Sequence, residues 1–226
     1  MSFAHQDQNK EQKQDEKEEQ NLTNHDILRL LCSKYTNDSI YVYKSCCDGR
    51  YLVVLMKLHD TKTNEKRYVT NRKYAKFRAD KLFVIAIYDT YDPHNIDIGD
   101  SSLLSINSHY SNNGKKKSLT YTIGEIVYPD SYDENINNIC SNGVHYYTSP
   151  LPAIFHKKSY NDSYFKNETF LYQNWTDNGE CCYSGCIVKG SREGTWYRTI
   201  FSGDKNKPNV QFYCEVYKNH QLIYIL

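Results

Sequence analysis

The feature that most restricts the fold of this sequence is a series of five short strand-like runs separated by turn residues. The runs cover residues 170–175, 180–188, 195–201, 210–217 and 221–226. Runs of this length with turn residues between them, such as Asp177-Asn178-Gly179, indicate consecutive antiparallel hairpins. We therefore predict that these residues form a β-meander.

The preceding part of the chain also has the character of strands. Residues 39–46 and 51–60 flank Asp48-Gly49, a strong hairpin signal, and residues 82–88 form a further apolar run. The chain has 22 Tyr, which suits half-exposed strands. These runs predict a twisted, mainly antiparallel sheet over residues 39–155.

One short helix is predicted near the N-terminus. Thr23 or Asn24 can cap it, and Ile27, Leu30 and Leu31 share one face at helical spacing. The expected fold is therefore α+β and mainly antiparallel β, with a twisted sheet, one short N-terminal helix and a C-terminal β-hairpin meander.

Changes in composition divide the chain into three parts. Residues 1–22 are rich in Gln, Glu, Lys and Asp without periodic apolar positions, which predicts a disordered polar tail. Residues 23–160 form the predicted α+β domain, in which residues 92–117 read as a surface insertion. Residues 161–226 form the meander.

Charge and hydropathy exclude several classes of function. Lys plus Arg number 28 against 27 Asp plus Glu, so we expect no sequence-specific nucleic-acid partner. No apolar run approaches the ~18 residues of a membrane span, and the charged N-terminus lacks a signal-peptide core. We therefore expect no transmembrane segment, a cytosolic location, and eight reduced cysteines.

Four motifs between residues 40 and 155 resemble those of an uncharacterised domain of large DNA virus proteins. They are Tyr43-Lys44, Ala-x-x-Arg-Ala at residues 75–79, Tyr-x-x-Gly-Glu at residues 121–125, and Cys-x-x-Gly-Val-His-Tyr at residues 140–146. The resemblance implies a viral origin, a location in the host cytoplasm or the virion, and a viral or host protein as partner. It implies no activity.

The meander has a second resemblance. Gly185, Gly190, Gly194 and Trp196, followed by Ser202-Gly203, are spaced as in a degenerate membrane-occupation-and-recognition-nexus (MORN) repeat, over roughly two units. In such repeats successive hairpins stack aromatic residues, so the resemblance implies an aromatic layer within the meander.

Cys140 and His145 are the candidate catalytic residues. An imidazole near a thiol favours the thiolate, so the pair could act as nucleophile and base. Alternatively, the two residues stabilise a tight loop, with His145 hydrogen-bonded to backbone carbonyls and Cys140 filling a small apolar space.

Lys44, Arg78 and Glu125 are the candidate ligand-binding residues. Together with His145 they could bind a phosphate or a nucleotide, because Lys and Arg supply charge-assisted donors. The alternative is a buried Arg78–Glu125 ion pair that fixes strand register.

No metal site and no cofactor are predicted. The residues that could supply zinc ligands are Cys181, Cys182, Cys186 and Cys214, with His220. Tetrahedral zinc needs sulfurs within about 4 Å of one another. On one extended strand Cys182 and Cys186 would lie about 13 Å apart, at ~3.3 Å per residue. The common nucleotide-binding and metalloprotease motifs are also missing.

These observations favour a non-enzymatic module that binds or scaffolds proteins, because exposed Tyr and Trp on a meander supply the aromatic anchors of interfaces. One alternative is a nucleotide- or phosphate-binding enzyme that uses Arg78, Glu125, Cys140 and His145. A second alternative is a membrane-surface module that uses Lys115-Lys116-Lys117 and the meander.

Overall fold

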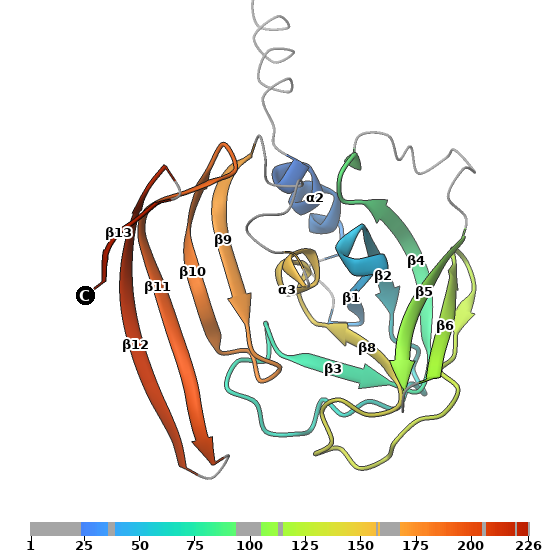
Figure 1. The fold of residues 1–226 in the computed structure, drawn as a ribbon. Helices are drawn as coiled ribbons and strands as arrows, with labels where there is room; N and C mark the ends of the chain where they lie inside the picture. Colours follow the sequence, from blue (N-terminus) through green and yellow to red (C-terminus); the bar gives the residue numbers. More distant parts are fainter. Residues whose placement is uncertain are drawn as a thin grey trace, which may run out of the picture.

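The computed structural model describes residues 24–35, 39–93, 105–112, 115–156, 158, 168–204, 207–219 and 221–225. These residues form three sheets whose strand pairs are all antiparallel (Figure 1). The predicted mainly antiparallel β architecture is thereby confirmed.

The largest sheet has six strands in the order β3-β8-β1-β2-β4-β7, and it curls into a half-barrel. Its strand β8 lies between β3 and β1, although it follows all of its neighbours in the chain. The strands are β1 (Tyr41–Cys46), β2 (Tyr51–Met56), β3 (Lys76–Ala79), β4 (Leu82–Asp89), β7 (Ile126–Val127) and β8 (Val144–Tyr147), with a short 3-10 helix η1 (Cys47–Gly49) between β1 and β2.

The second sheet is the meander, with five strands in the order β13-β12-β11-β10-β9. Each strand pairs with the next along the chain, as a series of hairpins requires. The strands are β9 (Thr169–Trp175), β10 (Cys181–Val188), β11 (Ser191–Asp204), β12 (Lys207–Lys218) and β13 (Gln221–Ile225).

A separate hairpin of β5 (Ser105–Asn112) and β6 (Lys115–Thr122) forms the third sheet. Much of it falls within residues 92–117, the expected surface insertion, and β6 continues into the Tyr-x-x-Gly-Glu motif at residues 121–125. Residues 94–104 of that insertion and the whole of the predicted tail, residues 1–22, lie outside the described residues.

The six-stranded sheet is covered on both faces. Consecutive residues of a strand point to opposite faces. In β2, Leu52 and Val54 belong to one buried cluster, while Val53 and Leu55 belong to another. This explains why β2 reads as a continuous apolar run rather than as an alternating one.

The cluster on one face also contains the inner face of the meander. Two helices, α2 (Asn24–Ser33) and α3 (Pro150–Phe155), lie in Figure 1 between the two large sheets. Phe155 of α3 stacks on Phe170 of β9 with ring centroids 5.7 Å apart, and Trp196 of β11 is fully buried in the same cluster. Both sheets therefore share one apolar core.

Gly185 explains part of the glycine and tryptophan spacing in the meander. A Cβ at this position would lie 2.0 Å from Cδ2 of Trp196, so the indole packs directly against the β10 backbone. The ring also lies 4.9 Å from that of Tyr183 and 6.0 Å from that of Tyr172. An aromatic layer thus fills the inner face of the meander.

None of the helices in the described part of the chain is both long enough and apolar enough to cross a membrane.

Candidate functional site

Three side chains from distant segments meet where the two large sheets adjoin. They are Lys76 on β3, Cys140 in the loop between β7 and β8, and Asp177 in the turn between β9 and β10. The Cys140 thiol donates to Asp177 Oδ2 at 3.1 Å. Lys76 Nζ lies 3.3 Å from Cys140 Sγ and 2.8 Å from Asp177 Oδ1. We call these three residues the thiol site.

In the thiol site, Lys76 and Asp177 each stabilise the charged form of the other. Burial tends to raise the pKa of Asp177, but the hydrogen bonds from Lys76 and Cys140 lower it below its usual range. Burial tends to lower the pKa of Lys76, but Asp177 raises it. At neutral pH the site therefore holds an ion pair of ammonium and carboxylate, and both groups contact the sulfur of Cys140.

Arg67 fixes the backbone of two of these residues. It is a buried residue of the segment between β2 and β3. Its Nη2 donates to the carbonyls of Lys76 at 2.7 Å and of Asp177 at 2.8 Å. Its Nη1 donates to Asn178 Oδ1 at 2.7 Å, so the guanidinium ties the β9–β10 turn to β3.

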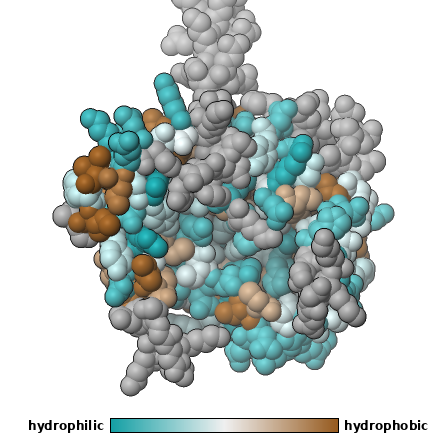
Figure 2. Space-filling view, viewed as in Figure 1, coloured by the Kyte–Doolittle hydropathy of each residue, from teal (hydrophilic) through white to brown (hydrophobic). Residues whose placement is uncertain are grey.

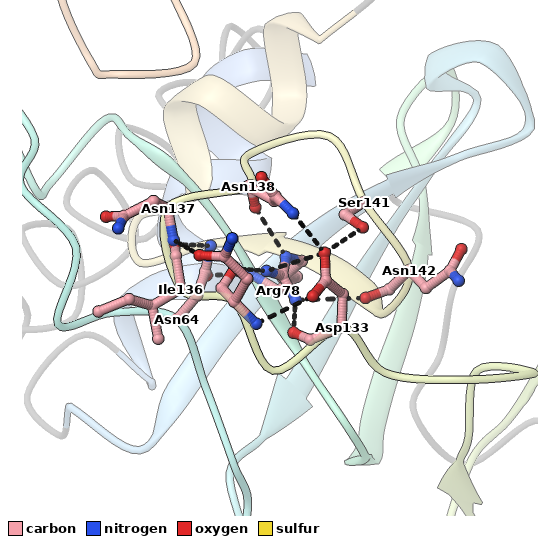
Figure 3. A network of polar contacts seen from close by, with 9 residues as sticks. Asn64, Arg78, Asp133, Ile136, Asn137, Asn138, Ser141 and Asn142 are labelled. Carbon is pink, nitrogen blue, oxygen red and sulfur yellow. Dashed lines mark hydrogen bonds and ion pairs between the residues drawn. The ribbon is translucent and has the colours of Figure 1, made fainter.

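Arg78 fixes the loop that carries the third residue. Its side chain is 0% exposed, and Figure 3 shows it surrounded by the loop. It donates to the carbonyls of Asn138 at 3.0 Å and Asn142 at 3.4 Å, which flank Cys140 on both sides, and to those of Asp133 and Asn135. A buried guanidinium is stable here because its donors have acceptors.

The acidic partner of Arg78 is Asp133, whose Oδ2 lies 3.9 Å from Nη2. Ser141 Oγ donates to this carboxylate at 2.6 Å and Asn138 Nδ2 at 2.8 Å. These hydrogen bonds lower the pKa of Asp133 to about 2. The carboxylate paired with Arg78 is therefore that of Asp133 and not, as hypothesised, that of Glu125. Through this ion pair Arg78 holds the loop between β7 and β8.

Gly143 shows why the motif at residues 140–146 has this form. Its φ is +144°, and a Cβ there would lie 3.1 Å from the Ala79 carbonyl oxygen and 3.2 Å from Arg78 Cβ. The loop can close over Arg78 only where a side chain is missing and the backbone tolerates positive φ. The motif thus forms the cover over Arg78.

His145 follows on β8, directly opposite Arg78 in the β3–β8 register. Burial lowers its pKa to about 4, and the positive charges of Lys44, Lys76 and Arg78 lower it as well. A hydrogen bond with the Ile139 backbone opposes this shift only in part. The imidazole is therefore neutral at physiological pH. No hydrogen bond joins His145 to Cys140, whose polar partners are Lys76 and Asp177.

Lys44 and Glu125 do not complete a pocket with Arg78. Lys44 lies on β1 in the middle of the six-stranded sheet, close enough for its charge to lower the pKa of His145. Glu125 is exposed, and its carbonyl accepts from Val84 N at 2.9 Å. It therefore lies beside β4 and β7, at the sheet edge opposite β3.

The eight cysteines are all unpaired thiols. Within the described ranges, no group of three or more His, Cys, Asp or Glu side chains is arranged to hold a metal ion. The sulfurs of Cys182 and Cys186 contact the Asn174 and Ile187 carbonyls respectively. His220, the remaining candidate zinc ligand, lies outside the described residues.

A second candidate surface is the face of the meander that points away from the core. In β11 Trp196 points inward, so its neighbour Tyr197 points outward, and the register places Phe212 and Tyr224 on the same side. In Figure 2 some apolar side chains lie along the meander side of the molecule, interspersed with polar ones. We define the outer meander face by six exposed residues: Leu171, Tyr197, Phe201, Val210, Phe212 and Tyr224.

Sequence reasoning identified Cys140 and Arg78 but missed Lys76, Asp177, Arg67 and Asp133. Asp177 was read only as a turn residue. Residues 133–142 contain two acidic residues and four Asn, and such a segment exposes many backbone carbonyls that turns leave without partners. That density of carbonyls is the signal in the sequence for a buried cation.

The comparisons with known proteins give one match. A family model described as a family of unknown function (DUF5758) matches residues 30–153. The span is more than half of the 226 residues and includes every strand of the six-stranded sheet together with Arg78, Cys140 and His145. No curated protein and no solved structure gives a significant match. The expected relationship to an uncharacterised family is confirmed over these residues.

Proposed function

We propose that this chain, which belongs to the family of unknown function (DUF5758), is a non-enzymatic module that binds another protein through the outer meander face. The observation that carries the proposal is the exposure of large apolar side chains on one continuous sheet face. Tyr197 is 63% exposed and Phe212 is 77% exposed. Contiguous exposed apolar surface of this kind marks interaction sites.

The register of the meander brings these side chains together. Thr199 of β11 lies opposite Phe212 of β12, which makes Tyr197 and Phe212 diagonal neighbours, while Phe201 lies opposite Val210. Diagonal neighbours on one face are within reach of aromatic side chains. Two aromatic anchors on a rigid sheet suit a protein interface, because aromatic side chains dominate interface energetics at low entropic cost.

The partner that we propose is a viral or host protein. The resemblance of residues 40–155 to a domain of large DNA virus proteins supports a viral or host protein as partner, bound in the host cytoplasm or in the virion. The MORN-like spacing supports a meander built to present an interaction surface. On this proposal the chain is a virion component or a modulator of a host process.

The two alternatives gain less support from the geometry. For a nucleotide- or phosphate-binding enzyme, Arg78 would need donors directed at a ligand, yet its guanidinium donates to carbonyls of the loop between β7 and β8. For a membrane-surface module, Lys117 pairs with Asp130, which reduces the positive charge of the triple lysine. Neither alternative is proposed further.

The test is quantitative affinity purification from the organism that expresses the chain. Three tagged proteins are compared: the wild type, the double variant Tyr197→Ser with Phe212→Ser, and the control Tyr68→Ser, which removes a side chain that is 90% exposed elsewhere. We expect the double variant to lose specific partners that the control retains. An identical partner set for all three proteins would refute the proposal.

A second arm excludes misfolding as the cause of lost binding. Thermal unfolding of the purified variants should match that of the wild type, because surface substitutions change stability by only about 0.5 kcal/mol.

Sedimentation velocity over a range of concentrations should show whether the outer meander face binds a second copy of the chain.

A further inference from the structure

We propose that Cys140 is a modification site at which hydrogen peroxide oxidises the thiol to a sulfenic acid, with Asp177 as proton acceptor and Lys76 as proton donor. This inference concerns the thiol site alone and is independent of the protein-binding function proposed above.

The surroundings of Cys140 differ from those of the other cysteines. Cys32 and Cys46 are buried, and burial raises the pKa of both thiols, that of Cys32 to about 12. Cys181 is exposed like Cys140, but the hydrogen-bond partner of its sulfur is the uncharged Tyr183 carbonyl, at 3.6 Å. Cys140 is the exposed cysteine whose sulfur touches both a carboxylate and an ammonium.

Those two partners supply what peroxide oxidation requires. The thiol proton passes to Asp177 Oδ2 as the sulfur attacks one peroxide oxygen. The O–O bond breaks, and the leaving hydroxide takes a proton from Lys76 Nζ to become water. Asp177 then returns its proton to Lys76. The balance is Cys–SH plus H₂O₂ giving Cys–SOH plus H₂O, in which sulfur is oxidised and peroxide is reduced.

The site is preorganised by two buried arginines. Arg67 holds the backbone of Lys76 and Asp177, and Arg78 holds the loop on both sides of Cys140. The Lys76 side chain is itself largely buried, so little rotational freedom is lost when its ammonium meets a reacting group. Cys140 remains exposed, which gives a small oxidant access.

The primary test uses the internal comparison between Cys140 and Cys181. The full chain is treated with hydrogen peroxide in the presence of dimedone, which captures sulfenic acids, and labelling of each cysteine is followed by mass spectrometry. We expect Cys140 to be labelled at least roughly tenfold faster than Cys181. Labelling of Cys140 at or below the rate of Cys181 overturns the proposal.

Substitutions of Lys76 and Asp177 test the role of each residue in the oxidation of Cys140. Lys76→Gln and Asp177→Asn should each slow the labelling of Cys140 toward the rate of Cys181, whereas Lys76→Arg, which keeps a cationic donor, should retain most of it. The rate at Cys181 and the thermal unfolding midpoint report whether each variant still folds. Unchanged labelling of Cys140 in Lys76→Gln would contradict the role of Lys76.

A second reagent separates proton donation from simple positioning. Iodoacetamide alkylates the same sulfur but releases iodide, which needs no proton. Lys76→Gln should therefore slow the peroxide reaction more than the alkylation. Equal slowing with both reagents would show that Lys76 only positions the thiol, and the donor step would be rejected.

Discussion

The two large sheets differ in how they use their faces. The six-stranded sheet is covered on both sides, by one apolar cluster shared with the meander and by another that includes the β5–β6 hairpin residue Ile106. The meander is covered only on its inner face, where Trp196 is buried, while Tyr197 on the same strand is 63% exposed. A sheet needs one covered face for stability, so the second face is available for another role.

The family match follows the same division. Residues 30–153 include the whole six-stranded sheet and none of the meander strands. Within that span, residues 75–79 and 140–146 supply Arg78 and its cover, which are structural features of the covered sheet. The open face therefore belongs to the part of this chain that the family model does not match.

The largest expected effect tests this comparison at two adjacent residues of β11. Trp196→Ala should lower the free energy of unfolding by about 3–5 kcal/mol, because it leaves a cavity in the shared core. Tyr197→Ala should change it by only about 0.5 kcal/mol. Urea unfolding followed by circular dichroism measures both. Similar losses in the two variants would mean that the outer meander face is not open.

The second effect concerns the covered sheet. Arg78→Met should lower the free energy of unfolding by about 3 kcal/mol, because four loop carbonyls lose their donor and Asp133 loses its cation. The loop at residues 128–143 should also become sensitive to limited proteolysis. Arg72→Met is the matched control, since the Arg72 side chain is 56% exposed.

If Arg78→Met were as stable and as protease-resistant as Arg72→Met, the loop would be held by its own hydrogen bonds, such as those of Asp133 with Ser141 and Asn138. The buried guanidinium of Arg78 would then contribute nothing to the stability of the covered sheet.

The sequence predicts an element well where the residues that form it are close together in the chain. The meander strands and the β1–β2 hairpin are encoded by local turn residues such as Asp48-Gly49, and their pairing is correspondingly local. The position of β8 between β3 and β1 depends on contacts between residues far apart in the chain, and no local pattern reports it. Helix α3 was missed because its six residues include two prolines.

The candidate site shows the same limit. Cys140 and Arg78 were found because they occur in recognisable motifs, but their partners Asp177 and Asp133 come from a turn and a loop. The expected pairing of Arg78 with Glu125 follows from motif membership alone, whereas strand order places the two residues at opposite edges of the sheet. Which charges meet is a tertiary property.

The smallest expected effect tests whether the covered sheet also resists protonation. His145 has a pKa of about 4 in the folded protein against an ordinary value of 6.5, so between these values the unfolded chain binds a proton that the folded chain does not. Stability should therefore be fully present above about pH 6.5 and decline progressively as the pH falls toward 4.

His145→Gln isolates this contribution, because glutamine does not titrate in that range. Urea unfolding of wild type and variant at intervals from pH 7 to pH 4 should give curves that converge as the pH falls, with the wild type losing more stability. His59→Gln is the control, since the His59 side chain is 96% exposed and should leave the wild-type profile unchanged. Parallel profiles for wild type and His145→Gln would show that the imidazole is hydrated when folded, and the face of β3 and β8 at this position would then count as open, like the outer meander face.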